Sequence, residues 1–559
     1  MCRKVIEVGL IIAILLGTKA IAATQFAYQV TFNDKNNTPY SFSSPLTYLS
    51  SRALSRRAAQ GIAIDSTDLP VNPAYIDSVL TLTGGEFHEA SRWLNLCVVL
   101  VLDSNQIHAL YGKPFISNIK LVGYYSPNIL HRPANTTGGA IAPIAGARKT
   151  SSSDNLHYGD TWNQTSMVNG NYLYDLGYQG NGKLIAVLDA GFYTVDTDPG
   201  FNNLWASGLM VDKHNFTLAS ENVFNYGTHG TQVLSTMAGY LPGQFVGSAP
   251  FASYALYITE DNNSEQPIEL INMLCGAEHA DSLGADIITT SLGYNTFDNL
   301  SDNFNFPIDF DGKTTTTAKA ANMATKKGIL FVATAGNEGG DSWNMILTPG
   351  DADSALTIGS VDGTGSVWHT SGYGPNAAGQ IKPDVCGLGH GAYVFTNPGD
   401  GASDGTSFST PQIAGWAACL WEANPNATPY QIRQAIIRCA SSYSAPGPHI
   451  GYGIPDFHCT EHVLNVKEMP PPLSVINWVI AAPDPFNDEI KLTVSPSASQ
   501  DVDFTMIDMT GKTVASLHQF LFNGYPTSIT LSVSYLPAGV YVLKAASATQ
   551  QQVLKLEKL

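Results

Sequence analysis

Ile185-Ala-Val-Leu-Asp189-Ala-Gly191 is a short apolar run that ends in a carboxylate and a glycine. A continuous apolar run of this kind is typical of a strand that is buried on both faces. We therefore expect a strand over Lys183–Leu188. It would place Asp189 at its carboxyl end, where a parallel sheet forms the crevice that receives ligands.

Two further stretches carry a base and a hydroxyl beside glycines: Gly227-Thr-His229-Gly-Thr231 and Gly405-Thr-Ser407-Phe-Ser-Thr-Pro411. Apolar residues follow both at helical spacing, so we expect each side chain at the start of a helix. The spaced positions are Val233, Leu234, Met237 and Ala238 after the histidine, and Phe408, Pro411, Ile413, Ala414, Ala417, Leu420 and Trp421 after the serine. A helix N-terminus offers free N–H groups, which suits a site where negative charge develops on oxygen.

Asp189, His229 and Ser407 together are the parts of an activated serine nucleophile, in which the acid orients the base and the base takes the hydroxyl proton. Each also has a plain structural interpretation: a turn residue at a strand end, a core histidine and a helix N-cap. The presence of all three favours the catalytic interpretation. The Gly-x-Ser-x-Gly hydrolase pattern does not fit, because Ser409 stands two residues after Ser407 and the acid and base precede the serine.

These stretches resemble the signature boxes of the subtilisin-like serine proteases, the subtilases, from near Tyr158 to near Asp456. Other landmarks match in order: Val246-Gly-Ser-Ala-Pro250, Gly284-Ala-Asp-Ile-Ile-Thr-Thr-Ser-Leu-Gly293, Ile329-Leu-Phe-Val-Ala-Thr-Ala-Gly-Asn337 and Ile381-Lys-Pro-Asp-Val385. The resemblance implies a three-layer α/β domain with helices on both faces of a mostly parallel sheet. The expected strands are 185–189, 252–258, 285–291 and 329–334.

The resemblance also assigns the side-chain amide of Asn337 to the oxyanion, with the Ser407 N–H as second donor. Attack on a peptide carbonyl puts negative charge on one oxygen, and one positioned donor there is worth roughly 3–4 kcal/mol of barrier. Asn337 is flanked by Gly336 and by Gly339-Gly340, so a turn role is the alternative.

Substrate binding is expected along two segments. Ser291-Leu292-Gly293 resembles the family's extended segment that pairs with the substrate backbone, and Thr334-Ala335-Gly336 resembles the facing wall of the pocket before the scissile bond. Pairing as an added strand gives affinity with little sequence demand, and small residues allow close approach. The pocket would accept large uncharged side chains. Ser291-Leu292-Gly293 could otherwise be a plain strand terminus.

The N-terminal part divides into three segments. Residues 1–22 have the charged, apolar and small-residue parts of a signal peptide. Residues 24–126 form a small α+β unit that resembles the pro-regions of secreted Bacteroidetes-type subtilases, which implies a folding aid and inhibitor. Residues 127–154 form a linker where cleavage could occur. A constitutive binding domain is the alternative for residues 24–126.

The catalytic domain is expected over 155–465, followed by a Pro-rich linker over 466–480. Residues 481–559 show short alternating segments between Gly and Pro turns, which predicts a small β-sandwich. Its motifs resemble the C-terminal sorting domain of the type IX (Por) secretion system, although Ala482-Pro-Asp-Pro485 stands where Tyr-Pro-Asn-Pro is usual. An accessory β-domain is the alternative.

Composition narrows the partners. The 46 acidic and 28 basic residues give a formal charge of −18, which disfavours nucleic acid and anionic membranes. Beyond the signal, no run has the roughly 18–20 apolar residues of a membrane helix. The five cysteines after residue 126 are odd in number, and Cys439 with Cys459 is one plausible pair, although sequence alone leaves the pairing open. Structural Ca²⁺ is possible by resemblance, the chemistry needs no cofactor, and metal ligands stay unassigned.

We therefore expect a secreted serine endopeptidase, extracellular or attached to the cell surface. It would act on protein or peptide substrates, be inhibited by its own pro-region and meet the secretion machinery through its C-terminal domain. Two other functions stay open: a peptide ligase that passes the acyl group to an amine, and a non-catalytic surface binding protein on the same scaffold.

Overall fold

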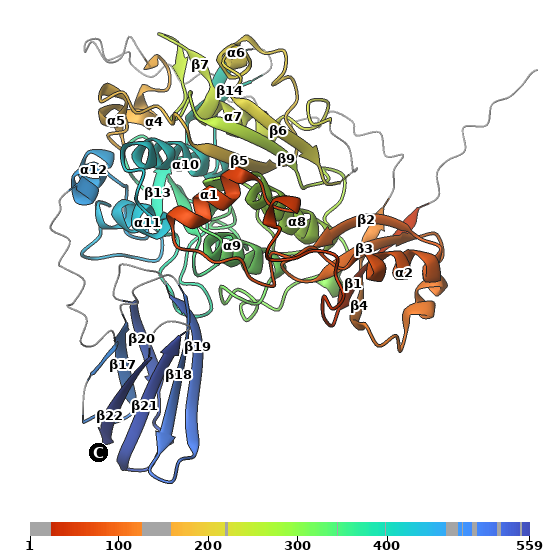
Figure 1. Cartoon of the computed structure of the whole chain (residues 1–559). Helices are drawn as coiled ribbons and strands as arrows, with labels where there is room; N and C mark the ends of the chain where they lie inside the picture. The colour runs from red at the N-terminus through yellow and green to blue at the C-terminus, as the bar shows by residue number, and fades with distance from the viewer. Residues whose placement is uncertain are drawn as a thin grey trace, which may run out of the picture.

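The computed structural model describes residues 24–125, 158–217, 222–343, 345–396, 399–465, 479–482, 485–494, 500–521, 527–547 and 551–559. Figure 1 shows a small N-terminal body, a large central body and a C-terminal β body along the chain. The predicted signal peptide, the 127–154 linker and most of the 466–480 linker lie outside the described residues.

The central body is built on a seven-stranded sheet in which every paired neighbour is parallel. The strand order is β13-β12-β11-β10-β5-β9-β6. The strands are β5 Leu184–Asp189, β6 Met210–Asn215, β9 Ser253–Ile258, β10 Ile287–Thr290, β11 Leu330–Thr334, β12 Leu356–Val361 and β13 Val385–Leu388. All six residues of β5 are buried, as its apolar sequence predicts. β10 ends at Thr290, directly before Ser291.

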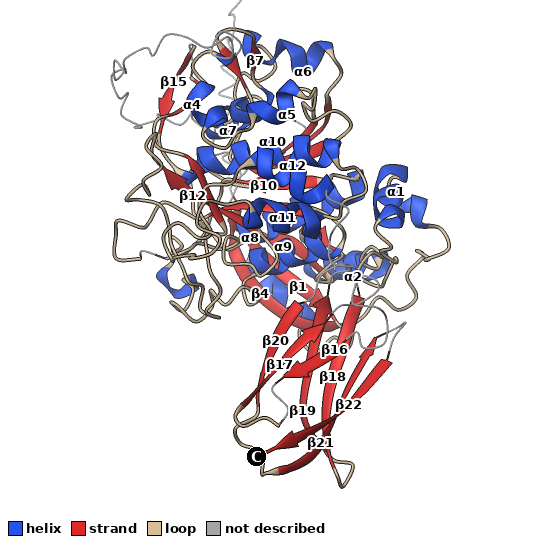
Figure 2. Cartoon of the chain, turned by 90° about the vertical axis from the view of Figure 1, so that its left-hand side faces the viewer, coloured by secondary structure: helices blue, strands red, loops and turns tan. Residues whose placement is uncertain are grey.

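Helices cover both faces of this sheet, which confirms the predicted three-layer α/β fold (Figure 2). Alternate residues of β5 pack on opposite layers: Ile185 and Val187 meet α7 and α10, whereas Ala186 and Leu188 meet α8 and α9. The helices are α4 Trp162–Ser166, α5 Asn171–Asp175, α6 Asn202–Ala206, α7 His229–Ala238, α8 Ile268–Leu283, α9 Thr316–Lys326, α10 Thr406–Ala423, α11 Pro429–Arg438 and α12 Phe457–Asn465, with short 3₁₀ turns at Pro199–Phe201 and Leu300–Asp302.

Smaller features complete the central body. Two hairpins pair β7 Tyr240–Leu241 with β8 Phe245–Val246, and β14 Ala392–Phe395 with β15 Asp400–Ser403. A disulfide joins Cys439 and Cys459, which confirms the suggested pair. Cys275, Cys386 and Cys419 are free and buried.

The N-terminal body is the predicted α+β unit. Its antiparallel sheet has the order β2-β3-β1-β4 and packs one face on α2 and the other on α8. The elements are β1 Gln25–Phe32, α1 Ser51–Ala59, α2 Pro73–Thr83, β2 Glu86–Ser91, β3 Leu96–Val101 and β4 Ile116–Tyr125, with 3₁₀ turns at Pro45–Thr47 and Ser104–Leu110. In Figure 1, α1 lies apart from this sheet and over the central body.

A buried ionic cluster joins the N-terminal body to α8. Asp281 lies 2.5 Å from Arg56, 2.7 Å from Arg57 and 2.6 Å from Arg92, with these side chains almost fully buried. Burial alone would raise the pKa of Asp281, but the three guanidinium groups hold it below its usual value. Glu278, one turn earlier, accepts hydrogen bonds from the backbone N–H of Arg92 at 2.8 Å and of Trp93 at 3.1 Å.

The C-terminal body is a β-sandwich, as predicted. Three antiparallel strands in the order β16-β17-β20 face four in the order β19-β18-β21-β22 around one apolar core. They are β16 Val479–Ala482, β17 Glu489–Val494, β18 Gln500–Asp508, β19 Thr513–Leu521, β20 Thr527–Ser532, β21 Gly539–Ser547 and β22 Gln551–Lys558. Along β18 the burial alternates, as it does in a strand with one face in the core.

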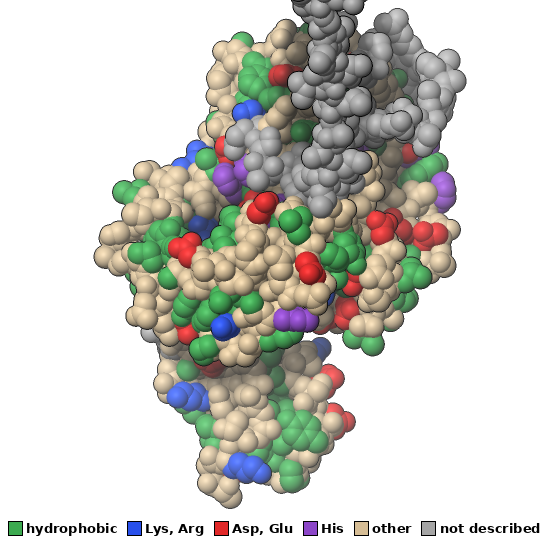
Figure 3. All heavy atoms as spheres, turned by 90° about the vertical axis from the view of Figure 1, so that its right-hand side faces the viewer, with side chains coloured by type: hydrophobic (Ala, Val, Ile, Leu, Met, Phe, Trp, Pro, Cys, Tyr) green, Lys and Arg blue, Asp and Glu red, His purple; other side chains and the backbone are tan. Residues whose placement is uncertain are grey.

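Charged groups on the surface are mixed in sign. On the face drawn in Figure 3, the described Lys and Arg side chains are scattered rather than gathered into one patch. A search of the described helices for one long and apolar enough to cross a bilayer finds none.

We predict that Asp281→Asn destabilises the full chain, because it leaves three buried guanidinium groups without their shared carboxylate. Removing one partner of a buried ion pair costs about 3–5 kcal/mol. Urea unfolding followed by intrinsic fluorescence measures the loss. Asp77→Asn, an exposed change on α2, is the matched control, and equal stabilities of the two variants would refute the prediction.

Candidate active site

The sheet and α7 bring the predicted acid and base together. Asp189 is the last residue of β5 and is fully buried, and His229 is the first residue of α7. His229 Nδ1 lies 2.8 Å from Asp189 Oδ1, which also accepts the Ala190 N–H at 2.7 Å. This contact favours the tautomer that carries a proton on Nδ1 and leaves Nε2 able to accept one.

Two opposing effects set the pKa of His229. Burial disfavours the charged imidazolium and lowers the pKa, whereas the charge and hydrogen bond of Asp189 favour it. The carboxylate outweighs burial, so the pKa lies above its usual value. The imidazole is therefore a stronger base than a free histidine, while its side chain is still 35% exposed.

Ser407 lies in the first turn of α10, one residue before a ring that lies near the imidazole. The ring of the following residue, Phe408, lies 6.1 Å from the His229 ring, centroid to centroid. Ser407 Oγ is 3.5 Å from the carbonyl oxygen of Ser291, and among the described residues no hydrogen bond joins it to His229. Such bonds are often loose without substrate and tighten in the reacting complex. The N–H of Ser407 is one of the free donors at the helix start.

Asn337 follows β11 and faces the same helix start. Its side-chain Oδ1 accepts the Thr406 N–H at 2.9 Å and lies 3.0 Å from Thr406 Oγ1. Because a backbone N–H can only donate, this contact fixes the amide orientation and leaves Nδ2 able to donate elsewhere. The sequence analysis did not single out Thr406, although this residue directly precedes Ser407.

The two predicted substrate segments flank the serine. Ser291 Oγ donates to the Ser407 carbonyl at 2.8 Å, and Ser291, Leu292 and Gly293 lie in neither a strand nor a bridge. Opposite them, Thr334 Oγ1 donates to Thr406 Oγ1 at 2.6 Å. The structure thus brings both segments to the serine and leaves the Ser291–Gly293 backbone outside the sheet ladders.

The Leu347 side chain lies against a glycine of each segment, and the sequence analysis did not single it out. A Cβ added to Gly293 would lie 2.9 Å from the Leu347 side chain, and one added to Gly336 would lie 2.5 Å from it. Gly336 has a φ of 93°, which further disfavours any side chain there. Glu338 adds a carboxylate at this wall, since its Oε2 accepts the Asn337 N–H at 2.7 Å.

An acidic group lies close to the buried acid. The loop after β9 is tied to it, because the Thr259 N–H donates to the Asp189 carbonyl at 3.1 Å and Asn262 Nδ2 to the Ala190 carbonyl at 2.9 Å. Glu260 in this loop accepts a hydrogen bond from the Tyr294 hydroxyl at 2.9 Å. Sequence analysis missed this group because its carboxylates are spread over ten residues in a loop and a helix start.

Within the described residues, Glu260, Glu265 and Glu269 are the group whose oxygen atoms could hold a metal ion, since they lie within 4.8 Å of one another. Burial, followed by the charge of Asp298, raises the pKa of Glu265 to about 7. Burial and then Glu265 raise the pKa of Glu260 well above its usual value. Carboxylate oxygens are the ligands that suit Ca²⁺.

Comparisons with known proteins identify the family of the central domain. The model of the Subtilase family matches residues 180–454, a range that contains Asp189, His229, Asn337 and Ser407. The central domain belongs to the subtilase family. Two further family models match this subtilase: the Peptidase S8 propeptide domain of Bacteroidota over 27–136 and the Secretion system C-terminal sorting domain over 481–558.

Curated relatives of this subtilase cover about half of the chain. Thermostable alkaline protease of Halalkalibacterium halodurans is 28% identical over 50% of this chain and 68% of its own length. Subtilisin NAT of Bacillus subtilis subsp. natto is 29% identical over 52% of this chain and 68% of its own length. Thermophilic serine proteinase of Bacillus sp. strain AK1 is 27% identical over 60% of this chain and 72% of its own length.

Together, these matches identify a subtilisin-like serine protease with a propeptide and a sorting domain. The sorting domain indicates export to the cell surface or the extracellular space.

Proposed function

We propose that this subtilase is a serine endopeptidase that hydrolyses peptide bonds through an acyl-enzyme. Ser407 Oγ attacks the carbonyl carbon, and His229 Nε2 takes its proton and returns it to the leaving amine. Asp189 orients the imidazole and stabilises the imidazolium. Water, activated by the same histidine, then releases the acyl group. The observation that carries the proposal is the 2.8 Å contact between His229 Nδ1 and the buried Asp189 carboxylate.

The oxyanion would be held by Asn337 Nδ2 and the Ser407 N–H. The orientation of the Asn337 amide supports this role, since Thr406 occupies its oxygen and leaves the nitrogen to donate. Donors that are oriented before the reaction begins would make such a site effective.

Substrate would lie along Ser291-Leu292-Gly293, with the side chain before the scissile bond between this segment and Thr334-Ala335-Gly336. The position of the first segment outside the sheet ladders supports strand addition. Leu347, which lies against Gly293 and Gly336, supports a preference for large uncharged side chains. No cofactor is required for these steps.

The pro-region would inhibit the enzyme until it is cleaved, and we retain 24–126, 155–465 and 481–559 as the proposed bounds of the three domains. One contact supports inhibition at the cleft. The Tyr124 N–H, in the last strand of the pro-region, donates to Gln266 Oε1 at 2.6 Å, in the loop that also carries Glu260. The C-terminal domain would engage the secretion machinery.

We predict that a fluorophosphonate probe labels the secreted enzyme at Ser407. Ser407→Ala should abolish labelling, peptidase activity and self-cleavage of the pro-region, all read by intact mass. Ser366→Ala, on an exposed loop, is the matched control and should behave as the parent. Equal labelling of both variants would remove Ser407 from the mechanism. A ligase would instead transfer the acyl group to an added amine, and the mass of the product would include that amine.

We predict that kcat/KM falls on the acid side with an apparent pKa above about 6.5, the ordinary value for histidine. The sign follows from the mechanism: His229 must be neutral to accept a proton, and Asp189 raises its pKa, so activity is lost as the pH drops through that raised value. A pH series from 5 to 9 measures it. The residual activity of Asp189→Asn should have its acid limb at lower pH, and an unmoved limb would contradict the assignment.

We predict that Thr406→Val lowers kcat about tenfold and leaves KM nearly unchanged, because it removes one of the two groups that hold the Asn337 amide. A net loss of about 1 kcal/mol per hydrogen bond sets this scale. Thr406→Ser keeps the hydroxyl and should restore kcat. A rise in KM alone, or failure of serine to restore kcat, would show that Thr406 does not position Asn337.

A further inference from the structure

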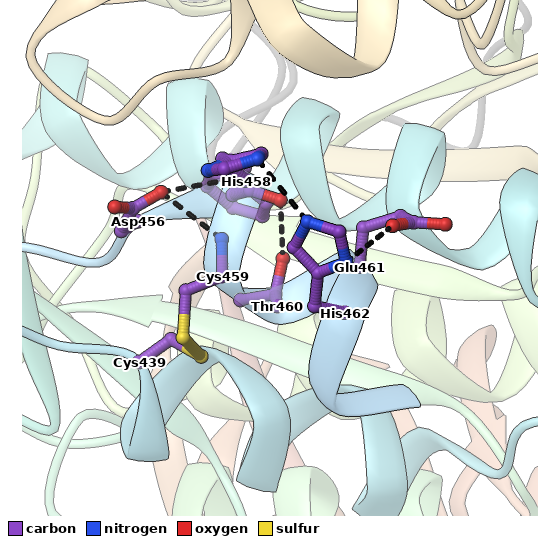
Figure 4. Close-up of a disulfide and its surroundings, with 8 residues drawn as sticks. Cys439, Asp456, His458, Cys459, Thr460, Glu461 and His462 are labelled. Carbon is purple, nitrogen blue, oxygen red and sulfur yellow. Dashed lines mark hydrogen bonds and ion pairs between the residues drawn. A yellow bond between two sulfur atoms is a disulfide. The ribbon is translucent and has the colours of Figure 1, made fainter. Parts of the chain in front are cut away.

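Two histidines lie one turn apart on α12, outside the catalytic cleft. His458 and His462 lie four positions apart and therefore share one face of the helix. Their Nε2 atoms are 3.2 Å apart, and the ring centroids are 4.8 Å apart at an interplanar angle of 76°. Figure 4 shows the two imidazoles meeting at these nitrogens. The proposed peptidase mechanism uses neither residue.

The spacing of the two nitrogens matches that of ligands on one metal ion. Two Zn–N bonds of about 2.0–2.1 Å at a tetrahedral angle put the nitrogens about 3.3–3.4 Å apart. An N–H···N hydrogen bond would give a similar distance in the metal-free protein. If the two rings share such a hydrogen bond, one of them carries its proton on Nε2. When an ion binds, that ring gives up the Nε2 proton and carries its proton on Nδ1 instead.

The surroundings favour the tautomer that a metal needs. Glu461 Oε2 lies 3.7 Å from His462 Nδ1, on the side of the ring away from His458. The negative charge at this position favours the proton on Nδ1 and leaves the Nε2 lone pair free, as carboxylates behind ligating histidines do in metal sites. The Tyr172 ring packs edge-on against His458, with centroids 4.3 Å apart, and limits the rotation of that ring.

The helix that carries the pair is held at its start. The disulfide from Cys439 ends at Cys459, between the two histidines, so this cysteine offers no thiolate to a metal. Asp456 Oδ1 accepts the N–H groups of His458 at 2.9 Å and Cys459 at 3.2 Å. Figure 4 shows this cap and the disulfide beside the pair. An ion would thus meet a preformed pair rather than one it must order.

We propose that His458 and His462 bind one divalent transition-metal ion of the class that prefers imidazole, with Zn²⁺ as the representative. Both side chains are exposed, the His462 side chain by 59%, so an ion reaches them from solvent and water completes its coordination. Imidazole nitrogens suit Zn²⁺, Ni²⁺ and Cu²⁺ rather than Ca²⁺. The bound ion cross-links two successive turns of α12 and stabilises the end of the catalytic domain.

Zinc titration of the untagged full chain tests this site. The Ser407→Ala form, freed of metal with a chelator, keeps the chain uncleaved during calorimetry with Zn²⁺. We expect the Ser407→Ala form to bind one more Zn²⁺ ion than the same form with either His458→Ala or His462→Ala added. Zn²⁺ should also raise the thermal midpoint of the first form and not of the two histidine variants. Alanine favours helix at both positions, and circular dichroism verifies folding.

His108→Ala is the matched control, since His108 is an exposed histidine that also packs against a tyrosine, Tyr111, but has no second imidazole. It should keep the stoichiometry and the midpoint shift. Zinc held by the glutamates near the cleft would be lost in none of these variants, so the difference of one ion isolates the α12 pair. Unchanged stoichiometry in either pair variant, or no zinc bound by the chain with both histidines, would overturn the proposal.

Discussion

The parallel pairing of β5 with its two neighbours is the constraint on which the active site depends. Asp189 pairs with Ile258 of β9, and Leu188 pairs with Thr290 of β10, so three strands end at one edge of the sheet. Thr259 and Glu260 follow the end of β9 and Ser291 follows the end of β10, separated in sequence by the whole of α8. Parallel strands require crossovers of this length, and the crossovers place the helices that cover both faces.

Helix starts then bring the reactive groups to this edge. His229 opens α7 and Ser407 lies in the first turn of α10, and both helices pack on the same face of the sheet. Their free N–H groups favour negative charge in the space between them. A fully buried carboxylate at Asp189 would be costly by itself, and the imidazole and the Ala190 N–H offset that cost.

The contact between pro-region and catalytic domain depends on buried charge to an unusual extent. Asp281 of the central body pairs with Arg56, Arg57 and Arg92 of the pro-region. Lys327 of the central body pairs with Asp65 and Asp68 of the pro-region, and Asp68 also pairs with Arg57. Each charge in this interface is satisfied by a group from the other body, so neither surface is complete alone. Separating the two bodies would therefore leave buried charges without partners on both surfaces.

Local sequence was sufficient for much of this protein. The apolar run before Asp189, the helical spacing after His229 and Ser407, and the Gly and Pro turns of the C-terminal strands each depend on neighbours within a few residues. The position of Thr406 against Asn337, of Leu347 between the two glycines, and of three glutamates around Tyr294 appeared only in the folded chain. The order of strands in the sheet brings those residues together over dozens of intervening positions, and no periodicity in the sequence records such contacts. Residue types and their local elements were therefore determined by the sequence itself, whereas the contacts that orient the proposed oxyanion donor and line the proposed pocket were decided by tertiary packing.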